Sequence, residues 1–280
     1  MTFTEKLIEA VRSSNSTLCV GLDPVPDNIP TFVQKKSDNL EEQVYLFCKG
    51  VIDATKNHAC AFKPNTAFFE ALGESGWRAL FRLRDEIPEN KILIADAKRG
   101  DIGHTADRYC AAFFEQLNAD ALTVNPLMGL DTLDAYLSFP SKAIFVLTMT
   151  SNRGAADFLN RRFEGRMSLG EYIAEELQKK QKTGSTHLGM VVGATQPQSI
   201  SPVLKASPAS HLLIPGIGAQ GGSTELLLKA LEGHQGIPVV SSSRTIIYAG
   251  RDQKNWQDSV GEMAKEIKQQ LQKITDHYVG

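Results

Sequence analysis

The chain has 280 residues, 30 of them basic and 32 acidic. The length suits one α/β barrel domain, and the near balance of charge, with no long run of one sign, argues against nucleic acid or an anionic membrane as a partner. No stretch approaches the roughly 18 apolar residues of a membrane span, and the N-terminus lacks the apolar core of a signal peptide, so we expect a cytoplasmic protein with a small-molecule partner.

Short apolar strands alternate with helical patterns along the chain. The strands are predicted to end near residues 22, 62, 95, 124, 147, 192, 214 and 241. Helices are predicted near 5–13, 40–57, 67–86, 105–117, 130–137, 155–182 (with a break near Gly165), 197–206, 223–231 and 253–277. Apolar strands separated by helices indicate a parallel sheet covered on its outer face. Eight such units predict a (β/α)8 TIM barrel, one domain over residues 1–280 with an N-terminal helix, although a doubly wound sheet would show the same alternation.

One stretch places several charges at the end of a predicted buried strand. The residues from Ile92 to Ala95 are apolar, and Asp96, Lys98 and Asp101 follow directly. Side chains alternate along an extended segment, so Asp96 and Lys98 should point to the same side. Charges at a buried strand end are costly unless they pair or act on a ligand. The stretch therefore predicts either a functional site or a structural salt-bridge cluster.

Polar residues also follow other predicted strands. Asp23 follows the first strand, Lys63 and Asn65 follow the second, and Asn125 follows the fourth. Active sites of (β/α)8 barrels are built from the loops after the strands, so these side chains should converge on one mouth. Taken singly, Asp23 is equally consistent with a turn cap, and Lys63 with an ordinary surface lysine.

The last two strand ends carry features of a phosphate site. The residues from Pro215 to Gly222 form a glycine-rich run that leads into a helix predicted to begin near Ser223. Backbone N–H groups of such a loop and the helix N-terminus can hold an anion. Arg244, after the eighth strand, can add a bidentate contact. A glycine-rich turn alone is weak support, but its position together with Arg244 favours phosphate binding.

The cysteines give no sign of a metal site or a disulfide framework. They are four in number, Cys19, Cys48, Cys60 and Cys110, and they show no CxxC spacing. Cys19 and Cys60 lie inside apolar runs, which predicts reduced thiols in the core.

The central stretch resembles the DxKxxDI signature of the orotidine 5′-phosphate decarboxylase family, in the form Asp96-Ala97-Lys98-Arg99-Gly100-Asp101-Ile102 followed by Thr105. The family's other blocks occur in the same order, as Gly21-Leu22-Asp23, Phe62-Lys63-Pro64-Asn65, Thr150-Ser151-Asn152-Arg153-Gly154-Ala155, Pro215 to Gly222, and Ser243-Arg244 with Ile247-Tyr248. The resemblance covers about residues 18 to 250 and is greatest to the longer bacterial branch. DxKxxD alone also occurs in 3-keto-gulonate-phosphate decarboxylase and hexulose-phosphate synthase, so the other blocks carry the specificity.

The resemblance implies that orotidine 5′-monophosphate loses CO₂ to give UMP in pyrimidine synthesis, without a metal or an organic cofactor. It implies a catalytic charge network of Lys63, Asp96, Lys98 and Asp101. In that network Lys98 protonates C6 of the pyrimidine and Asp96 lies against the substrate carboxylate. Asp101 would reach across a homodimer interface into the neighbouring site.

The resemblance also implies a set of substrate-binding residues. Asp23 and Thr105 would bind ribose hydroxyls, and Ser151 would bind the pyrimidine. The phosphate would be held by Gln220 and Arg244. Asn65 and Gly221 complete the set of residues expected at the substrate.

Three other functions remain open at this stage. A related phosphosugar decarboxylase or aldolase would use Mg²⁺, but Lys63 stands where those relatives carry a glutamate that helps to hold the metal, which argues against a divalent site. An aldolase could form a Schiff base on Lys63 or Lys98. An inactive nucleotide-binding barrel would have no need to keep Lys98 between two carboxylates.

Overall fold

The computed structural model of the chain describes residues 1–163, 165–193, 197–216 and 224–279. Eight parallel strands form a closed barrel in the order β1-β10-β9-β8-β5-β4-β3-β2. They are β1 (Leu18–Leu22), β2 (Ala61–Pro64), β3 (Ile92–Arg99), β4 (Ala121–Val124), β5 (Ala143–Met149), β8 (His187–Val192), β9 (Leu212–Pro215) and β10 (Pro238–Ser242). The predicted (β/α)8 barrel is confirmed. The alternative of an open sheet is wrong, because β1 pairs with both β2 and β10.

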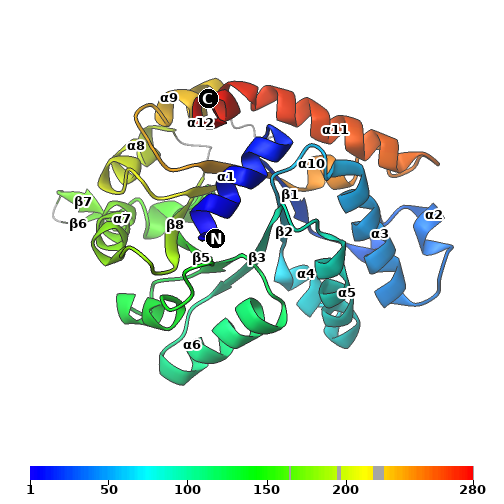
Figure 1. Ribbon diagram of the computed structural model, residues 1–280, viewed down its shortest axis with the longest axis horizontal. Coiled ribbons are helices and arrows are strands. Elements are labelled where there is room, and N and C mark those ends of the chain that lie inside the picture. The colour runs from blue at the N-terminus through cyan, green and yellow to red at the C-terminus, as the bar shows by residue number, and fades with distance from the viewer. Residues whose placement is uncertain (164, 194–196, 217–223, 280) are drawn as a thin grey trace.

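Helices surround the barrel (Figure 1). They are α1 (Phe3–Ser14), α2 (Thr31–Gln34), α3 (Leu40–Thr55), α4 (Thr66–Glu70), α5 (Gly73–Glu86), α6 (Gly103–Cys110), α7 (Leu169–Lys180), α8 (Pro197–Ala206), α9 (Thr224–Ala230), α10 (Arg244–Ile247), α11 (Trp256–Gln270) and α12 (Gln272–Val279). The larger apolar core lies between these helices and the strands. Within the described ranges, none of the helices combines the length and the apolar character needed to cross a membrane.

The interior of the barrel is filled by side chains that alternate with those of the outer core. On β3, Leu93 belongs to the outer core, whereas Ile92 and Ile94 belong to the inner cluster. The two-residue period of a strand produces this division. Asp96 is next in the same series as Ile92 and Ile94, so the inward-facing position becomes charged where the strand ends.

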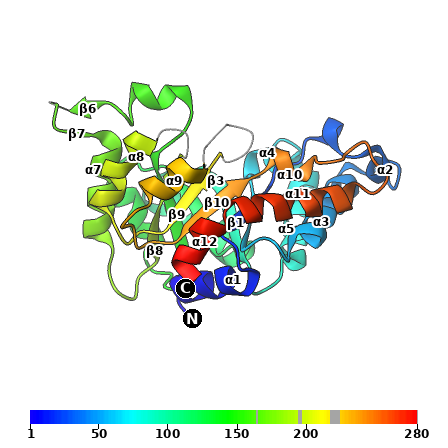
Figure 2. The same ribbon diagram turned by 90° about the horizontal axis from the view of Figure 1, so that it is seen from above.

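The first helix, α1, closes the end of the barrel at which the strands begin (Figure 2). Phe3 and Leu7 of α1 belong to the inner cluster of the barrel. Lys6 Nζ lies 2.6 Å from Asp120 Oδ1, just before β4. Apolar side chains of α1 therefore fill this end of the barrel, and the ends of the strands lie at the opposite rim.

The helix predicted over 155–182 is wrong in its first half. A 3₁₀ helix occupies Arg153–Asp157, and a two-stranded antiparallel hairpin follows, made of β6 (Arg162–Phe163) and β7 (Met167–Ser168). Gly165, between the two strands, has a φ of 68°, a conformation that glycine adopts without strain. The helix α7 begins only after β7, where a Ser168–Glu171 capping box supplies its N-terminus.

Other predicted helices are present but differ in form. The 67–86 helix is divided into α4 and α5 at Gly73, which has a φ of 61°. The terminal helix is divided into α11 and α12. The segment predicted over 130–137 is a 3₁₀ helix, Leu130–Tyr136, and α6 continues into a π-helical turn at Ala111–Gln116. These forms share the apolar face of an α-helix, so periodicity alone does not separate them.

The cysteines have the environment that their sequence positions predicted. All four are free and buried. Burial raises the pKa of the Cys19 and Cys110 thiols to about 12, so both are protonated at neutral pH.

Two histidines, the partly buried His187 and the buried His211, connect α1 to the closed end of the barrel. The rings of His187 and His211 stack with their centroids 4.1 Å apart. The His211 backbone N–H donates to His187 Nε2 at 3.1 Å, and Thr4 Oγ1 of α1 lies 3.0 Å from His211 Nε2. Burial lowers the pKa of His187 to about 4 and also lowers the pKa of His211. The packing under α1 therefore depends on two uncharged imidazoles.

We expect acid to destabilise the fold through these imidazoles. The pKa of His187 lies near 4 in the folded state and near 6.5 in an unfolded chain, so the unfolded state takes up protons first as the pH falls. The contribution of neutral His187 to the free energy of unfolding is complete above pH 6.5. It decreases by about 3 kcal/mol as the pH falls to 4. Urea unfolding at a series of pH values measures this decrease.

His187→Gln keeps a hydrogen-bond acceptor but does not titrate, so it should flatten the pH dependence of the free energy of unfolding. His104→Gln is the matched control, because the His104 side chain is fully exposed. The same pH dependence in wild type and His187→Gln would contradict this account.

Candidate active site

The end of β3 brings two lysines onto one carboxylate. Lys63 Nζ, from β2, lies 2.8 Å from Asp96 Oδ2, and Lys98 Nζ lies 2.5 Å from Asp96 Oδ1. The side chains of Lys63 and Asp96 are only 7% and 11% exposed, whereas that of Lys98 is 48% exposed. Asp96 therefore holds a buried ammonium on one side and a partly exposed one on the other. These three residues are called the lysine–aspartate cluster below.

The backbone at Lys98 is unusual for a strand. Its φ is 48°, in the left-handed region, and the pairing of β3 with β4 shifts register between Ala95 and Arg99. A non-glycine residue in this conformation costs about 1–2 kcal/mol, so surrounding contacts must hold it. The expected placement of Asp96 and Lys98 on the same side is confirmed, but a bulge contributes to it and not regular alternation alone.

Opposite charges determine the protonation of the cluster. Burial disfavours the charged form of Lys63, but the carboxylates of Asp96 and Asp23 outweigh it and raise the pKa of Lys63. Burial would also favour neutral Asp96, yet Lys63 and Lys98 lower the pKa of that carboxyl well below its usual range. Lys63 is therefore cationic and Asp96 anionic at neutral pH.

A hollow of 240 Å³ opens beside the cluster, at the ends of β1, β2, β9 and β10. Asp23, Lys63, Asn65, Gly216 and Arg244 are among the residues that line it. Arg244 is the first residue of α10 and is exposed, so its guanidinium is accessible to a ligand. We call this the first hollow.

Two buried oxygen atoms belong to residues of the first hollow. Asp23 Oδ1 and Ser242 Oγ are buried and have no hydrogen-bond partner within the described ranges. Buried polar atoms usually have partners, so hydroxyl or amide groups of a ligand would satisfy them. Tyr248 holds the Asp23 main chain in place, because its hydroxyl donates to the Asp23 carbonyl at 3.0 Å. Asn65 has a structural role as well, since its Oδ1 caps α4.

A second hollow, of 340 Å³, lies on the other side of Lys98. Its polar lining includes Lys98, Asn125 and Asn152, and its apolar lining includes Leu147 and Phe158. Lys63 lines the first hollow and Lys98 lines the second, so the lysine–aspartate cluster lies between them.

Two predicted site residues, Asp101 and Thr105, do not contact the lysine–aspartate cluster. Asp101 Oδ1 accepts a hydrogen bond from the Ile102 backbone N–H at 2.8 Å. Across the described part of the chain, no ion pair joins Asp101 to either lysine of the cluster. Thr105 lies exposed on α6 and is not among the residues that line either hollow.

The remaining predicted residues are in loops after β5 and β9. Ser151 follows β5, and its main chain approaches Gly193 so closely that a Cβ at Gly193 would lie 2.6 Å from Ser151 N. Glycine at this position thus allows the two loops to meet. Gln220 and Gly221, the expected phosphate contacts, lie outside the described residues.

Three residues that the structure places at the site had no predicted role. Thr123 donates a hydrogen bond to Asp96 Oδ1 at 3.0 Å, Ser242 lines the first hollow, and Tyr248 holds Asp23. A threonine or serine within an apolar strand is predicted to be an ordinary core residue. The available signal was strand alternation, which places Thr123 on the inner face with Ala121.

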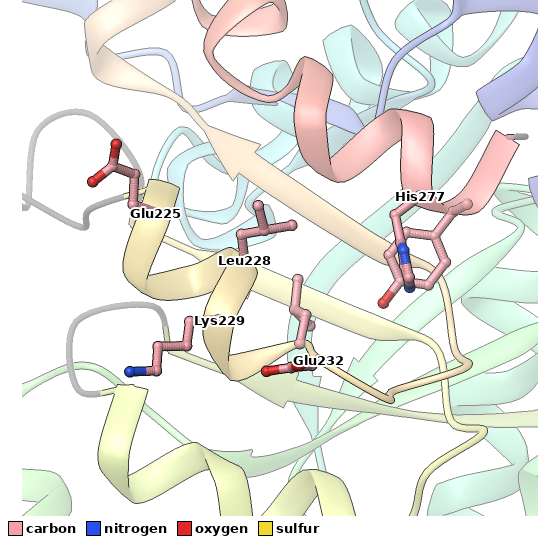
Figure 3. A pocket seen from close by; sticks show the side chains of 7 residues that line it. Glu225, Leu228, Lys229, Glu232 and His277 are labelled. Carbon is pink, nitrogen blue, oxygen red and sulfur yellow. The ribbon is translucent and has the colours of Figure 1, made fainter.

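A further hollow, of 340 Å³, lies on the outer helix layer between α9 and α12 (Figure 3). Leu228, Lys229, Glu232 and His277 are among its lining residues, and none of its lining belongs to the lysine–aspartate cluster. Over the part of the chain that the structure describes, no group of three or more His, Cys, Asp or Glu side chains is arranged to hold a metal ion.

The fold and the site define a (β/α)8-barrel enzyme that presents lysine and aspartate side chains at the ends of its strands. The chain matches the sequence model of the orotidine 5′-phosphate decarboxylase / HUMPS family over residues 16–258. It belongs to that family.

Individual relatives agree with this assignment. The chain is 43% identical to the orotidine 5′-phosphate decarboxylase of Roseiflexus sp. (strain RS-1), over 90% of each chain. It is 40% identical to that of Christiangramia forsetii, over 96% of this chain and 97% of the relative. Among solved structures, it resembles Leishmania donovani OMP decarboxylase with a TM-score of 0.80, 33% identity and 99% coverage of both chains. It also resembles Leishmania donovani UMP synthase with a TM-score of 0.83 and 35% identity, covering 98% of this chain and 57% of that one.

We expect Asp96→Asn to destabilise the protein strongly, because it leaves the buried Lys63 ammonium without its carboxylate. Breaking a buried ion pair from one side typically costs about 3–5 kcal/mol. Asp53→Asn is the control, because Asp53 pairs with Lys49 and Lys56 on the surface and should cost at most about 1 kcal/mol. Free energies of unfolding in urea give the comparison.

A double substitution tests whether the unpaired Lys63 ammonium causes this loss of stability. In Asp96→Asn/Lys63→Met the unpaired charge is gone, so much of the lost stability should return. A double variant as unstable as Asp96→Asn would rule out the uncompensated ammonium as the source of the loss.

Proposed function

We propose that the chain decarboxylates orotidine 5′-monophosphate to UMP and CO₂, a step of pyrimidine nucleotide synthesis. One observation carries the proposal. Asp96 holds the partly exposed ammonium of Lys98 at the barrel mouth, between a polar hollow and a more apolar one. Membership of the family supports the same reaction.

We assign the phosphate and the ribose to the first hollow. The planar guanidinium of Arg244 suits a phosphate, and the unpaired Asp23 Oδ1 suits a ribose hydroxyl. Gln220 and Gly221 are proposed to complete the phosphate site. With its phosphate held there, the nucleotide can place its pyrimidine over Lys98, toward Ser151 and the second hollow.

In this placement the bond between C6 and the carboxylate breaks, and its electron pair stays on C6 as CO₂ leaves. The Lys98 ammonium stabilises the negative charge and then transfers a proton to C6, which gives UMP. Its neutral amine regains a proton from water. Two unit charges about 4 Å apart interact by roughly 4 kcal/mol at an effective dielectric of about 20. Asp96 holds the ammonium in place beforehand, so little reorganisation accompanies the step.

Asp96 also lies where it can repel the substrate carboxylate, and departure of neutral CO₂ would relieve that repulsion. We rank this contribution below stabilisation of the carbanion, because two ammonium groups already neutralise Asp96. The main role of Asp96 in the proposal is to hold Lys98, and that of Lys63 is to balance the charge of Asp96.

The cluster argues against the two chemistries of related barrels. Both Asp96 oxygens accept bonds from ammonium groups, and Lys63 adds a positive charge where a divalent cation would need an anionic ligand. A Schiff base on Lys63 would require a neutral amine, whereas Asp96 and Asp23 keep Lys63 charged. We therefore propose a reaction that needs neither metal nor organic cofactor.

Chelator-treated protein should consume orotidine 5′-monophosphate, followed by ultraviolet absorbance, as fast as untreated protein. Lys98→Ala should lose about 10²–10⁴-fold or more in kcat, because it removes both the charge and the proton donor. Lys36→Ala, on the exposed segment after α2, is the matched control. No turnover by folded wild type would remove the proposed function. Equal rates for wild type and Lys98→Ala would leave the activity but remove the proton donor.

We further propose that the chain acts as a homodimer in which Asp101 completes the neighbouring site. Three large apolar side chains in the loops after β3 and β4 are exposed: Ile102 by 55%, Leu127 by 61% and Met128 by 57%. Exposed apolar side chains that gather in one region suit a protein interface. Asp101 and Thr105 lie in the same region and do not meet their own cluster, which fits contacts made across such an interface.

Mixing two inactive variants tests the shared site. Lys98→Ala and Asp101→Ala each damage every site of their own dimer, but a mixed dimer contains one site with both changes and one with neither. Random exchange should therefore restore about a quarter of wild-type activity. Each variant mixed with itself is the control. No recovery, despite exchange of subunits shown by mass, would place Asp101 outside the partner's site.

We also propose that the barrel acts as one catalytic domain and works in the cytoplasm. The residues that line the first hollow come from strands of one closed sheet and from the segments that directly follow them. The four free, buried thiols suit a reducing compartment.

A further inference from the structure

Thr123 makes two hydrogen bonds to the residues at the centre of the site. It lies on β4 and is 1% exposed. Its hydroxyl donates to Asp96 Oδ1 at 3.0 Å and accepts the backbone N–H of Lys98 at 2.9 Å. The oxygen of Asp96 that it contacts is the same one that accepts the ammonium of Lys98. The Thr123 side chain thus contacts both the carboxylate of Asp96 and the main chain of Lys98, the proposed proton donor.

The location of this contact explains why a side chain is needed there. The register between β3 and β4 shifts between Ala95 and Arg99, and Lys98 lies within that shift with a φ of 48°. A strained residue persists only where its surroundings hold it. The Thr123 hydroxyl supplies the partner of the Lys98 amide at the bulge.

The donor and the acceptor of each of the two Thr123 hydrogen bonds follow from the groups involved. The Lys98 amide can only donate, and the Asp96 carboxylate can only accept. A hydroxyl accepts from the first and donates its one proton to the second. Serine satisfies the same pattern, whereas valine and alanine leave the amide without its partner and remove a donor from the carboxylate.

We propose that Thr123 is a positioning residue for the reaction, because its hydroxyl holds Asp96 and the left-handed backbone of Lys98 so that the ammonium meets charge at C6. The proposal rests on the proposed function and adds a residue to it. Thr123 lines neither hollow, so it acts through Asp96 and Lys98 and not by contact with substrate. Its loss should affect the step in which negative charge develops more than it affects nucleotide binding.

Thr123→Val keeps the shape of the side chain and removes the hydroxyl. We expect kcat to fall about 10- to 100-fold, the effect of leaving a buried polar group unsatisfied, while KM changes less than about threefold. Affinity for UMP should stay within about twofold. Affinity for 6-hydroxyuridine 5′-monophosphate, whose deprotonated ring carries negative charge on the oxygen at C6, should fall in parallel with kcat. Thr123→Ser should restore most of both quantities.

Thr186→Val is the matched control. Thr186 is also buried, donates to the Phe139 carbonyl at 2.9 Å and accepts the Phe139 N–H at 3.0 Å, but it lies at the closed end of the barrel. Its loss should lower stability and leave kcat unchanged. If Thr123→Val does not fold, Thr123→Ser against Thr123→Ala isolates the hydroxyl in the same way.

Any of three kinetic or binding results would overturn the proposal, and so would one structural result. The first three are an unchanged kcat in the folded hydroxyl-free variant, no rescue by serine, or equal losses of affinity for UMP and for the C6-oxyanion nucleotide. A crystal structure of Thr123→Val provides a readout that does not depend on activity, because Lys98 Nζ should leave Asp96 Oδ1. Wild type that fails to turn over orotidine 5′-monophosphate would remove the proposed function, whereas an undisturbed Asp96–Lys98 contact in that structure would remove the role of Thr123.

Discussion

The structure depends on one carboxylate, that of Asp96, placed between two ammonium groups. Burying the charge of Lys63 or of Asp96 alone would cost several kcal/mol, so these two are stable as a pair, to which the partly exposed Lys98 adds a second positive charge. Their assembly requires β2 to supply Lys63, β3 to supply Asp96 and Lys98, and β4 to supply the hydroxyl of Thr123. A closed parallel barrel meets this requirement because neighbouring strands end at the same rim. The chemistry and the fold are therefore coupled through one side chain.

The closed end of the barrel stabilises the fold, and the open end carries the functional side chains. At the closed end, α1 packs Phe3 into the inner cluster, and the neutral rings of His187 and His211 stack beneath it. At the open end the inward-facing positions become charged or carry hydroxyl groups, and buried oxygens such as Asp23 Oδ1 have no hydrogen-bond partner among the described residues. Apolar packing at the closed end can offset the free-energy cost of burying oxygen atoms that have no hydrogen-bond partner. This is the arrangement expected when a rigid scaffold supports a site prepared for a ligand.

The two hollows give a physical account of how a nucleotide can use its whole length. A phosphate held near Arg244 is remote from the bond that breaks, yet its binding free energy can be used to orient the base over Lys98. The second hollow, lined in part by Leu147 and Phe158, is less polar, and in the proposed reaction it would suit the region from which neutral CO₂ departs. Family membership supports the reaction, and the polarity of the two hollows is compatible with it.

The sequence by itself determined the number of barrel strands and their order along the chain, because each strand is a short apolar run and each is followed by polar residues. It also determined that Asp96 and Lys98 belong together, since they are two residues apart, and that Asp23, Lys63 and Arg244 lie at strand ends. Periodicity did not distinguish the β6–β7 hairpin from a helix, because that segment is short and its turn depends on one glycine conformation.

Only the tertiary structure decided which groups touch. The contact of Thr123 with Asp96 joins residues 27 positions apart, and it depends on a bulge that no local pattern reveals. The separation of Asp101 from its own cluster is likewise invisible in a motif that places it three residues after Lys98. Pairing between strands and burial of charge are properties of the closed barrel as a whole, so the positions of these residues along the chain do not specify them.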